Sequence, residues 1–512
     1  MGFERFKQKK YLYACLMGIC LLTAAVFAFV NRGNVNVLTP SASDMESGCI
    51  LFDTLSKGKY YVIVDYRASA EQMISLYAPE EEAWIVTDEK LKLREDSLQI
   101  CYPFTAVEDL TNFEARCEFD GNGFLTVRNI RIINATGGAF FHARNLFLAL
   151  TLLFLVLFLL NLCPETYAAP DNRFYWADAV RGIGIILVAI GHTWNNPGVF
   201  LIYGFHMPLF FILSGYLHKD RPLGTFCIKL VKNYLLPYLL FCFGNAILRI
   251  PYMIMWKYSF AEVIKQIGAY MLGSVRGLWP QMPNCIQLWF LPALAVALFI
   301  YRLIRLIPWR IVRVILYAAF ALTGYYYTTI SIATGIPYEL PWGQHAVPTA
   351  VAFLAIGHGL REINLKYRTT YDRWTLMQKG LLCFLLLASG VGAIVLNHLC
   401  FKDMDVYFNT YGNFFLTYIG AVAMSMFVIL AVHECRGNLT PNNYLVIIGC
   451  YSVFFFAYDF WAQYVAHAFP RITDDLDWYV IAVLKLILTM LLFIAWRNAK
   501  TLYLRVFRRK TP

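Results

Sequence analysis

Stretches of about 20 consecutive apolar residues recur along this chain of 512 residues, and no other feature constrains its fold as strongly. A helix needs roughly 17–25 mostly apolar residues to cross about 30 Å of hydrocarbon. Such stretches occupy residues 11–30 and 145–163, and more follow near 178–194, 201–217, 231–249, 286–304, 311–328, 345–360, 379–398, 413–432, 443–465 and 478–496. The sequence therefore predicts a mainly α-helical, polytopic membrane bundle of about 12 transmembrane helices.

The composition excludes several other classes of protein. Hydrophobic residues make up 59% of the chain and charged residues 15%, whereas soluble proteins are about half apolar and a quarter charged. The net charge of +11 does not require a nucleic-acid partner, because Lys and Arg gather in the cytoplasmic segments of membrane proteins. If the chain crosses the membrane at each predicted span, Lys and Arg concentrate in the segments on the cytoplasmic side, including the tail at 497–512. We therefore expect a multi-pass protein of the cell membrane with both termini in the cytoplasm, the lipid bilayer as a partner and no nucleic acid.

The chain is expected to have five parts. In order, these are a cytoplasmic tail with a first transmembrane anchor (1–30), an extracytoplasmic β-rich domain (31–143), a second transmembrane helix (144–164), a membrane domain of about ten helices (172–500) and a basic cytoplasmic tail (501–512). The first apolar stretch has the alternative of a cleaved signal peptide, but it is long and lacks a clear small-x-small cleavage site.

The segment between the first two apolar stretches has a different texture. Runs such as YYVIVDYRAS and GFLTVRNIRIIN alternate apolar and polar residues, and turn sequences such as FDGNG separate them. That alternation is typical of antiparallel strands with one buried face. We expect an extracytoplasmic β-sandwich-like domain, which serves either as a spacer or lid or as a module that binds a saccharide.

Two ionisable side chains stand out in the predicted helix at 178–194. Arg181 and His192 are 11 residues apart, so they lie about 20° apart around the helix axis and about 16 Å apart along it. Ionisable groups inside a span are costly and usually line a cavity or pathway. The alternatives are an Arg that reaches the lipid phosphates and a His that donates to a neighbouring helix. Because both residues share one face of a glycine-containing helix, a functional site is favoured.

The same stretch carries a family resemblance. An Arg, ten residues and then a His, in IGIILVAIGHTW followed by FHMPLFFILSGYL, resembles the membrane acyltransferase 3 family, and most closely its branch that includes fucose 4-O-acetylases. The resemblance covers roughly residues 172–500. QLWFLPAL (287–294) and GCYSVFFFAYDF (449–460) are similar to two further motifs of the family. This chain has Gln287 and Asp459 where relatives often have His.

The resemblance implies an enzyme, an acyltransferase transferring groups other than aminoacyl groups. Such an enzyme moves an acyl group, with acetyl expected, from cytoplasmic acyl-CoA to a hydroxyl of a cell-surface or lipid-linked sugar. The co-substrate is acetyl-CoA or another acyl-CoA. A sugar hydroxyl needs a base with a pKa near neutrality, and His192 is the catalytic candidate for that role. Arg181 is the second catalytic candidate, because a guanidinium binds the donor phosphates or a developing oxyanion.

Further candidates flank this pair. The substrate-binding candidates are His206, Asp178, Trp289 and Ser214, and the candidates that bind the cofactor are Arg181, Lys219 and Arg221. Each has a plainer alternative, such as a carboxylate at a helix N-terminus, an interfacial aromatic ring or a cation on the cytoplasmic side. The 13 Cys include no CxxC pair, so no metal site is expected.

Two rival functions stay open. A secondary transporter of a sugar or lipid-linked substrate also uses about a dozen spans and buried charges, but transporters often contain internal repeats, and none is convincing here. The third hypothesis is a glycan sensor, in which the β-rich domain binds sugar and the spans only anchor it. About 12 spans are more than an anchor needs, so this hypothesis ranks last.

Overall fold

The fold is described from a computed structural model of the whole chain. The structure describes residues 13–26, 42–44, 49–68, 72–78, 83–84, 91–93, 99–106, 109–118, 125–160, 169–170, 173–193, 196–255, 258–277, 286–337, 339–468 and 478–508. Contacts divide the chain into two units: 1–163 with 462–491, and 164–461 with 492–512.

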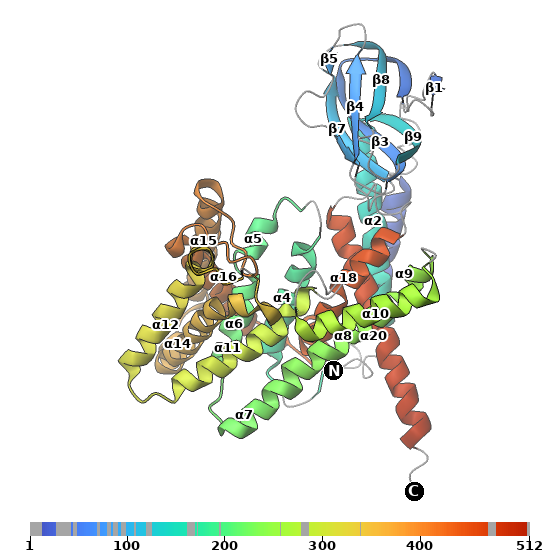
Figure 1. Cartoon of the computed structure of the whole chain (residues 1–512). Helices are drawn as coiled ribbons and strands as arrows, with labels where there is room; N and C mark the ends of the chain where they lie inside the picture. Colours follow the sequence, from blue (N-terminus) through green and yellow to red (C-terminus); the bar gives the residue numbers. More distant parts are fainter. Residues whose placement is uncertain are drawn as a thin grey trace. The chain divides into compact units, whose positions relative to one another are not determined.

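The first unit contains all the strands that the structure describes, and all of them pair antiparallel (Figure 1). They are β1 (Ala42–Asp44), β2 (Cys49–Leu55), β3 (Gly58–Ala68), β4 (Gln72–Ala78), β5 (Ala83–Trp84), β6 (Leu91–Leu93), β7 (Gln99–Ala106), β8 (Leu110–Glu118) and β9 (Leu125–Asn134). One sheet has the order β1-β2-β8-β4-β5, with β6 also paired to β4, and the other has the order β7-β3-β9. In the second sheet Val62 pairs with Ile132 and Val64 with Ile130, and all four side chains are buried.

Helices make up most of the second unit. They are α4 (Tyr175–Gly191), α5 (Val199–Tyr203), α6 (His206–Tyr216), α7 (Leu223–Leu230), η2 (Val231–Leu235), α8 (Leu236–Leu248), α9 (Ile250–Met255), α10 (Phe260–Arg276), η3 (Ile286–Trp289), α11 (Phe290–Arg305), α12 (Arg310–Tyr325), α13 (Tyr327–Thr334), η4 (Pro341–Ala346), α14 (Val347–Asp372), α15 (Leu376–Cys400), α16 (Phe414–Glu434), η5 (Arg436–Asn438) and α17 (Tyr444–Cys450). Helix α2 (Ala135–Leu160) belongs to the first unit, and α18 (Ser452–Ala468) and α20 (Trp478–Arg508) contribute residues to both.

The described part of the chain has fewer helices of membrane-spanning length than the 12 or so spans predicted. Among the described residues, six helices are long and apolar enough to cross a membrane, or up to eight if each bent pair counts as one span. The stretches predicted at 311–328 and 443–465 are the bent pairs, with angles of 71° between α12 and α13 and 89° between α17 and α18. Helix α4 has 17 residues, which is the lower limit for a span. Apolar composition alone did not show where these helices break.

The β-sandwich in the predicted fold class is not supported either. A sandwich needs two sheets that each contribute an inward apolar face. The two sheets that the structure describes differ in size, with six strands in one and three in the other. The first unit is therefore described as two antiparallel sheets of unequal size, and its position relative to the membrane stays a prediction.

Local sequence explains where several helices begin. Ser259 accepts from the backbone N–H of Glu262, whose carboxylate accepts from the N–H of Ser259, so a capping box starts α10. Thr375 and Gln378 form the same box before α15. Gly277, with φ of 66°, ends α10 in the left-handed conformation that glycine favours.

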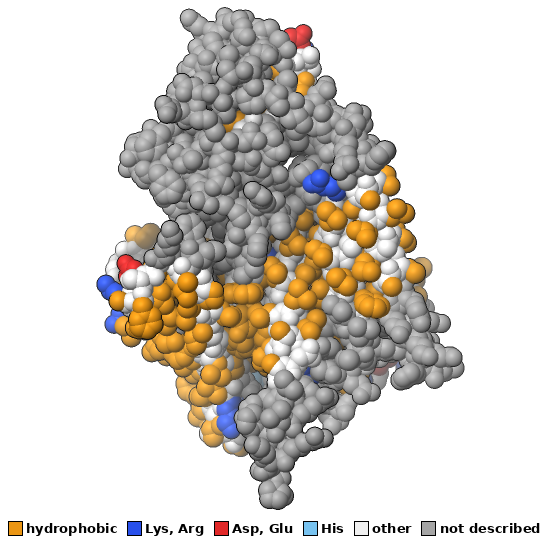
Figure 2. Space-filling view, turned by 90° about the vertical axis from the view of Figure 1, so that its right-hand side faces the viewer, with side chains coloured by type: hydrophobic (Ala, Val, Ile, Leu, Met, Phe, Trp, Pro, Cys, Tyr) orange, Lys and Arg blue, Asp and Glu red, His pale blue; other side chains and the backbone are white. Residues whose placement is uncertain are grey.

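Apolar surface is exposed on many helices, as expected for contact with lipid. Leu240 of α8, Ile311 of α12 and Phe384 of α15 are more than half exposed. Figure 2 shows apolar side chains gathered on one face of the molecule with few charges among them. Large continuous apolar patches are unusual on soluble monomers, so this surface fits a hydrocarbon environment.

Glycines let α6 and α14 approach until their backbones touch. A Cβ added at Gly215 would overlap the carbonyl oxygen of Leu354, and one added at Gly357 would overlap that of Ile212. Small residues at such crossings are a common device of membrane helices. The contact fixes α6, which carries several candidate site residues, against the long helix α14.

Replacing Gly357 with Ala is expected to destabilise the protein by about 1–3 kcal/mol, because the carbonyl it meets belongs to a rigid backbone. Gly359 of the same helix is the matched control, since no heavy atom lies within 4 Å of its added Cβ. Gly359→Ala should leave stability unchanged or raise it slightly through helix propensity. Thermal unfolding of the two variants in detergent measures the difference, and equal melting temperatures would refute the close contact.

Candidate active site

The first turn of α4 carries a buried carboxylate that binds two arginines. Asp178 is 1% exposed and accepts from Nε and Nη2 of Arg173, each at 2.7 Å. Arg181 donates from Nη1 to the same carboxylate, also at 2.7 Å. The hydrogen bond with Asp178 raises the pKa of Arg173 above its already high ordinary value, so its guanidinium stays charged. Gly182 and Gly449 bring the backbones of α4 and α17 into contact here and fix the position of the cluster.

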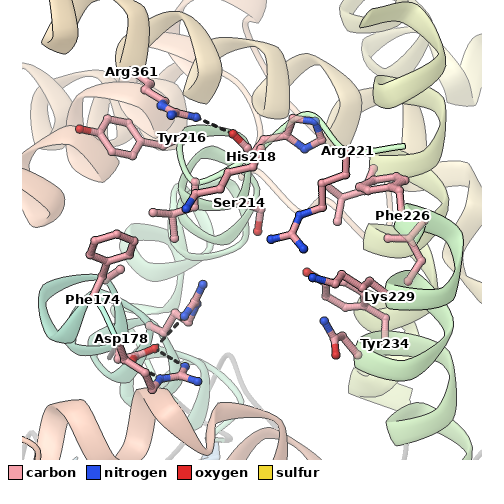
Figure 3. A pocket seen from close by; sticks show the side chains of 18 of the residues that line it. Phe174, Asp178, Ser214, Tyr216, His218, Arg221, Phe226, Lys229, Tyr234 and Arg361 are labelled. Atoms are coloured by element: carbon pink, nitrogen blue, oxygen red, sulfur yellow. Dashed lines mark hydrogen bonds and ion pairs between the residues drawn. The ribbon is translucent and has the colours of Figure 1, made fainter. Parts of the chain in front are cut away.

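A cavity of about 570 Å³ opens beside this cluster, and we call it the cationic cavity. Its six basic residues, against Asp178 as the one acid, are Arg173, Arg181, Lys219, Arg221, Lys229 and Arg361. Figure 3 shows Arg221 pointing into this space, with Lys229 on the same side of it and Asp178 on the opposite side. Within the described part of the chain, Lys219, Arg221 and Lys229 form no ion pair. The cavity therefore has a large excess of positive charge.

The loop between α6 and α7 carries Lys219 and Arg221, and its backbone is bound by side chains of two other helices. Arg302 of α11 donates to the carbonyl of Arg221 at 3.0 Å, and Arg361 of α14 donates to the carbonyl of His218 at 2.5 Å. Burial lowers the pKa of His218 to about 4, although the neighbouring Asp220 opposes this shift. At neutral pH His218 is therefore uncharged and adds nothing to the charge of the cavity.

A second cavity, of about 440 Å³, adjoins the first, and we call it the middle cavity. Arg181 and Ser214 line both cavities. The walls of the middle cavity combine apolar side chains, such as Phe290 of α11 and Phe456 of α18, with the cations Arg173, Arg181 and Lys232. Met207 of α6 lines the middle cavity and also a third one. The three cavities therefore form a series from Arg181 towards the far end of α4.

The third cavity, of about 150 Å³, contains His192, and we call it the histidine cavity. His192 directly follows the last residue of α4, and its Nδ1 lies 3.0 Å from Oδ2 of Asp459 in α18. An ionised carboxylate only accepts, so His192 donates from Nδ1, and its Nε2 is left as an acceptor. A buried carboxylate thus sets the tautomer of His192 and leaves Nε2 able to accept a proton.

Two other candidates share the histidine cavity with His192. His206 is buried, and its Nδ1 donates to the carbonyl oxygen of Ile202 at 2.9 Å. The ring centroids of Trp289 and Tyr407 lie 5.2 Å apart, and both residues line the cavity. Polar and aromatic groups therefore meet around the imidazole.

The predicted site residues thus fall into two groups. His192, His206 and Trp289 line the histidine cavity. Arg181, Asp178, Ser214, Lys219 and Arg221 line the cationic cavity. Ser214 was expected beside the substrate but lies at the Arg181 end of the series. Within the described residues, no group of His, Cys, Asp or Glu could hold a metal ion.

Comparison with known protein families matches an acyltransferase domain to residues 174–499, which is more than half of the chain. The chain belongs to the acyltransferase 3 family. Members of this family are membrane proteins, and family membership implies an acyl donor and an acceptor. The resemblance predicted from the sequence is therefore confirmed for the family, and the fucose 4-O-acetylase-like branch stays a prediction.

Two relatives of this acyltransferase are similar over part of their length. Nodulation protein NolL of Sinorhizobium fredii is 37% identical over 91 residues, which is 15% of this chain and 25% of that protein. Nodulation protein NolL of Mesorhizobium japonicum is 28% identical over 162 residues, which is 26% of this chain and 42% of that protein. The chain thus spans less than half the length of these curated relatives. No solved structure matches it.

Sequence reasoning missed the closest partner of His192 in this acyltransferase. Asp459 entered only as a departure from a family motif, although an acid in an apolar stretch is itself a signal of function. Gln287, the other departure, donates to the carbonyls of Phe456 and Ala457 at 3.1 Å each. It therefore fixes the turn of α18 that precedes Asp459. Of the remaining cations in the cationic cavity, only Arg361 is far away in the sequence. Arg173 lies five residues before Asp178 and Lys229 eight residues after Arg221, so local spacing could have suggested both.

Proposed function

We propose that this acyltransferase is a multi-pass enzyme that moves an acyl group, with acetyl expected, from acyl-CoA to a hydroxyl of a cell-surface or lipid-linked sugar. The single observation that carries the proposal is the series of three cavities between Arg181 and His192. The middle cavity shares Arg181 with the cationic cavity and Met207 with the histidine cavity. A donor with a charged head and a long arm fits such a series.

The charge of the cationic cavity supports CoA as the donor. CoA carries a pyrophosphate and a 3′-phosphate, and six basic residues line this cavity against one acid. Guanidinium groups bind phosphate through paired hydrogen bonds. The middle cavity, whose polar and apolar side chains suit the amides and methylene groups of the pantetheine arm, would hold that arm with its thioester directed towards Met207. A cytoplasmic donor would require the cationic cavity to open on the cytoplasmic side, and the cytoplasmic location of both termini is a separate part of the proposal.

The geometry of His192 supports its role as general base. Its Nε2 would take the proton of the acceptor hydroxyl while that oxygen attacks the thioester carbonyl. The tetrahedral intermediate then expels the CoA thiolate, which takes up a proton, and the acyl group remains on the sugar as an ester. Asp459 would keep Nδ1 protonated and stabilise the imidazolium that forms. Arg181, about 16 Å away along the helix, binds phosphate in this scheme rather than the oxyanion.

The proposal is tested with membranes that contain the full chain, ¹⁴C-acetyl-CoA and the host's cell-envelope glycan isolated from a strain lacking this gene. We expect label to enter the glycan and to be released by mild base, as an ester is. Membranes without the chain are the control. No transfer of label would contradict the proposal.

A secondary transporter is the alternative, and the bent pairs α12–α13 and α17–α18 favour it, since transporters place broken helices at their binding sites. Sealed vesicles that take up the glycan precursor without any acyl-CoA would support that function. Uptake with no ester formation would replace the enzyme proposal.

A further inference from the structure

A tight hairpin between α15 and α16 forms one wall of the histidine cavity. The backbones of Asp405 and Thr410 exchange hydrogen bonds of 2.8 and 3.0 Å. The carboxylate of Asp405 accepts through Oδ1 from the N–H groups of Tyr407, at 2.8 Å, and Phe408, at 3.1 Å. Asn409, with φ of 46°, completes the turn in the left-handed region. This turn directs Asp405 and Tyr407 to the wall of the cavity.

The hairpin is anchored to several neighbouring helices. Asn397 of α15 donates to the carbonyl of Lys402 at 2.9 Å and accepts from the N–H of Asn413 at 2.8 Å. Tyr325 of α12 donates to the carbonyl of Gly412 at 2.7 Å. A wall fixed in this way needs little ordering when a ligand binds, which favours affinity and selectivity.

Two residues of the cavity lining, from two different elements, carry acceptor oxygens. Within the described residues, one oxygen of Asp405 has no hydrogen bond, and Oε1 of Gln287 is buried without a partner, although Gln287 is only 3% exposed. A buried polar atom without a partner is costly, so a ligand that donates hydrogen bonds would stabilise it. Hydroxyl groups are donors of this kind.

The rest of the lining selects the class of molecule that carries those hydroxyls. Trp289 and Tyr407 offer aromatic faces to apolar C–H groups. No Lys or Arg is among the described residues that line the cavity, and the carboxylate of Asp405 would repel an anion. At about 150 Å³ the cavity is smaller than the roughly 300–1,000 Å³ of pockets that enclose drug-sized ligands. It therefore suits one small ring rather than an extended chain.

We infer that the hairpin and Gln287 form the acceptor subsite for a single neutral sugar ring, with Asp405 binding its hydroxyls beside the one presented to His192. The inference rests on the proposed transfer to a sugar and narrows the acceptor to a neutral residue. Asp405 touches the substrate in this arrangement and takes no part in proton transfer.

Asp405→Asn tests the subsite, because the amide oxygen keeps the turn while the charge is lost. With ¹⁴C-acetyl-CoA and the envelope glycan from a gene-deleted strain, we expect the KM for glycan to rise at least about tenfold. The KM for acetyl-CoA should stay unchanged. Tyr407→Leu, which removes the aromatic face but keeps the backbone, should also raise the KM for glycan. Asp403→Asn is the matched control, since Asp403 is on the same hairpin but is exposed and bonded to His398.

Each result has a distinct meaning. If Asp405→Asn and Tyr407→Leu both leave the KM for glycan unchanged, or lower only kcat, the inferred subsite is wrong. The proposed acyl transfer is not contradicted by either of these results. No transfer by the unmodified protein would overturn the proposed function itself. The esterified sugar, released and identified by mass spectrometry, should be neutral, and a uronic or sialic acid in its place would contradict the inference.

Discussion

Replacing His192 with Ala is expected to lower the rate of acyl transfer by about 10²–10⁴-fold, the usual contribution of a positioned general base. The loss should appear in kcat, because the imidazole acts on the hydroxyl proton and contributes little to binding acyl-CoA. Transfer of label from ¹⁴C-acetyl-CoA to envelope glycan measures kcat. Binding of CoA, followed as a rise in melting temperature, should persist and show that the variant is folded.

Asp459→Asn should cause a loss approaching that of His192→Ala, although the side chain keeps its shape. An amide can donate to Nδ1, which shifts the ring proton to Nε2, and His192 would then lack the acceptor that receives the hydroxyl proton. A wrong tautomer of this kind costs about 10⁴-fold in serine proteases. Because Asp459 acts through His192, the pH dependence of the residual activity should change as well.

The chain contains a matched control for this pair. His398 and Asp403 form a second His–Asp contact, with Nδ1 and Oδ1 2.7 Å apart, but both side chains are at least 40% exposed and lie outside the histidine cavity. His398→Ala and Asp403→Asn should transfer acetyl groups normally. Wild-type rates in His192→Ala, or equal losses in both pairs, would show that the histidine cavity is not where transfer occurs.

Changing Arg181 to Gln is expected to weaken acetyl-CoA binding by about 10- to 100-fold, since a hydrogen bond to a charged group contributes about 1.5–3 kcal/mol. Asp178 keeps its bidentate partner Arg173 in this variant, so the buried carboxylate is not left alone. Arg181→Lys should retain most of the affinity, because a cation remains in place. The KM for acetyl-CoA, measured at saturating glycan, gives the size of the effect.

A donor without phosphates distinguishes the two roles considered for Arg181, which are binding of the donor phosphates and stabilisation of the oxyanion. The N-acetylcysteamine thioester of acetate has the same reacting carbonyl as acetyl-CoA but no phosphates. If Arg181 binds phosphate, Arg181→Gln should use this donor as well as wild type does. An equal loss with both donors would instead place Arg181 at the oxyanion. Arg310→Gln is the control, because Arg310 is exposed, pairs with Glu362 and lies outside all three cavities.

The sequence predicted the family of the protein better than its fold. The spacing of Arg181 and His192 placed both on one helix because an α-helix repeats locally. In the structure that helix ends at Gly191, and His192 directly follows it. The sequence predicted more spans than the described helices of membrane length, because hydropathy measures composition in a window and does not detect a bend. The 89° angle between α17 and α18 is such a bend, inside a stretch that is apolar throughout.

The sequence alone determined three features of this protein, because each is a property of neighbouring residues. They are the apolar stretches, the family motif near Arg181 and His192, and the excess of basic residues. The tertiary structure decided which distant groups meet them. Asp459 lies 267 positions after His192 and Asp405 lies on a hairpin between two other helices. Helix packing brings these carboxylates to the imidazole, and packing depends on side-chain shape across the whole bundle, which no local pattern in the chain records.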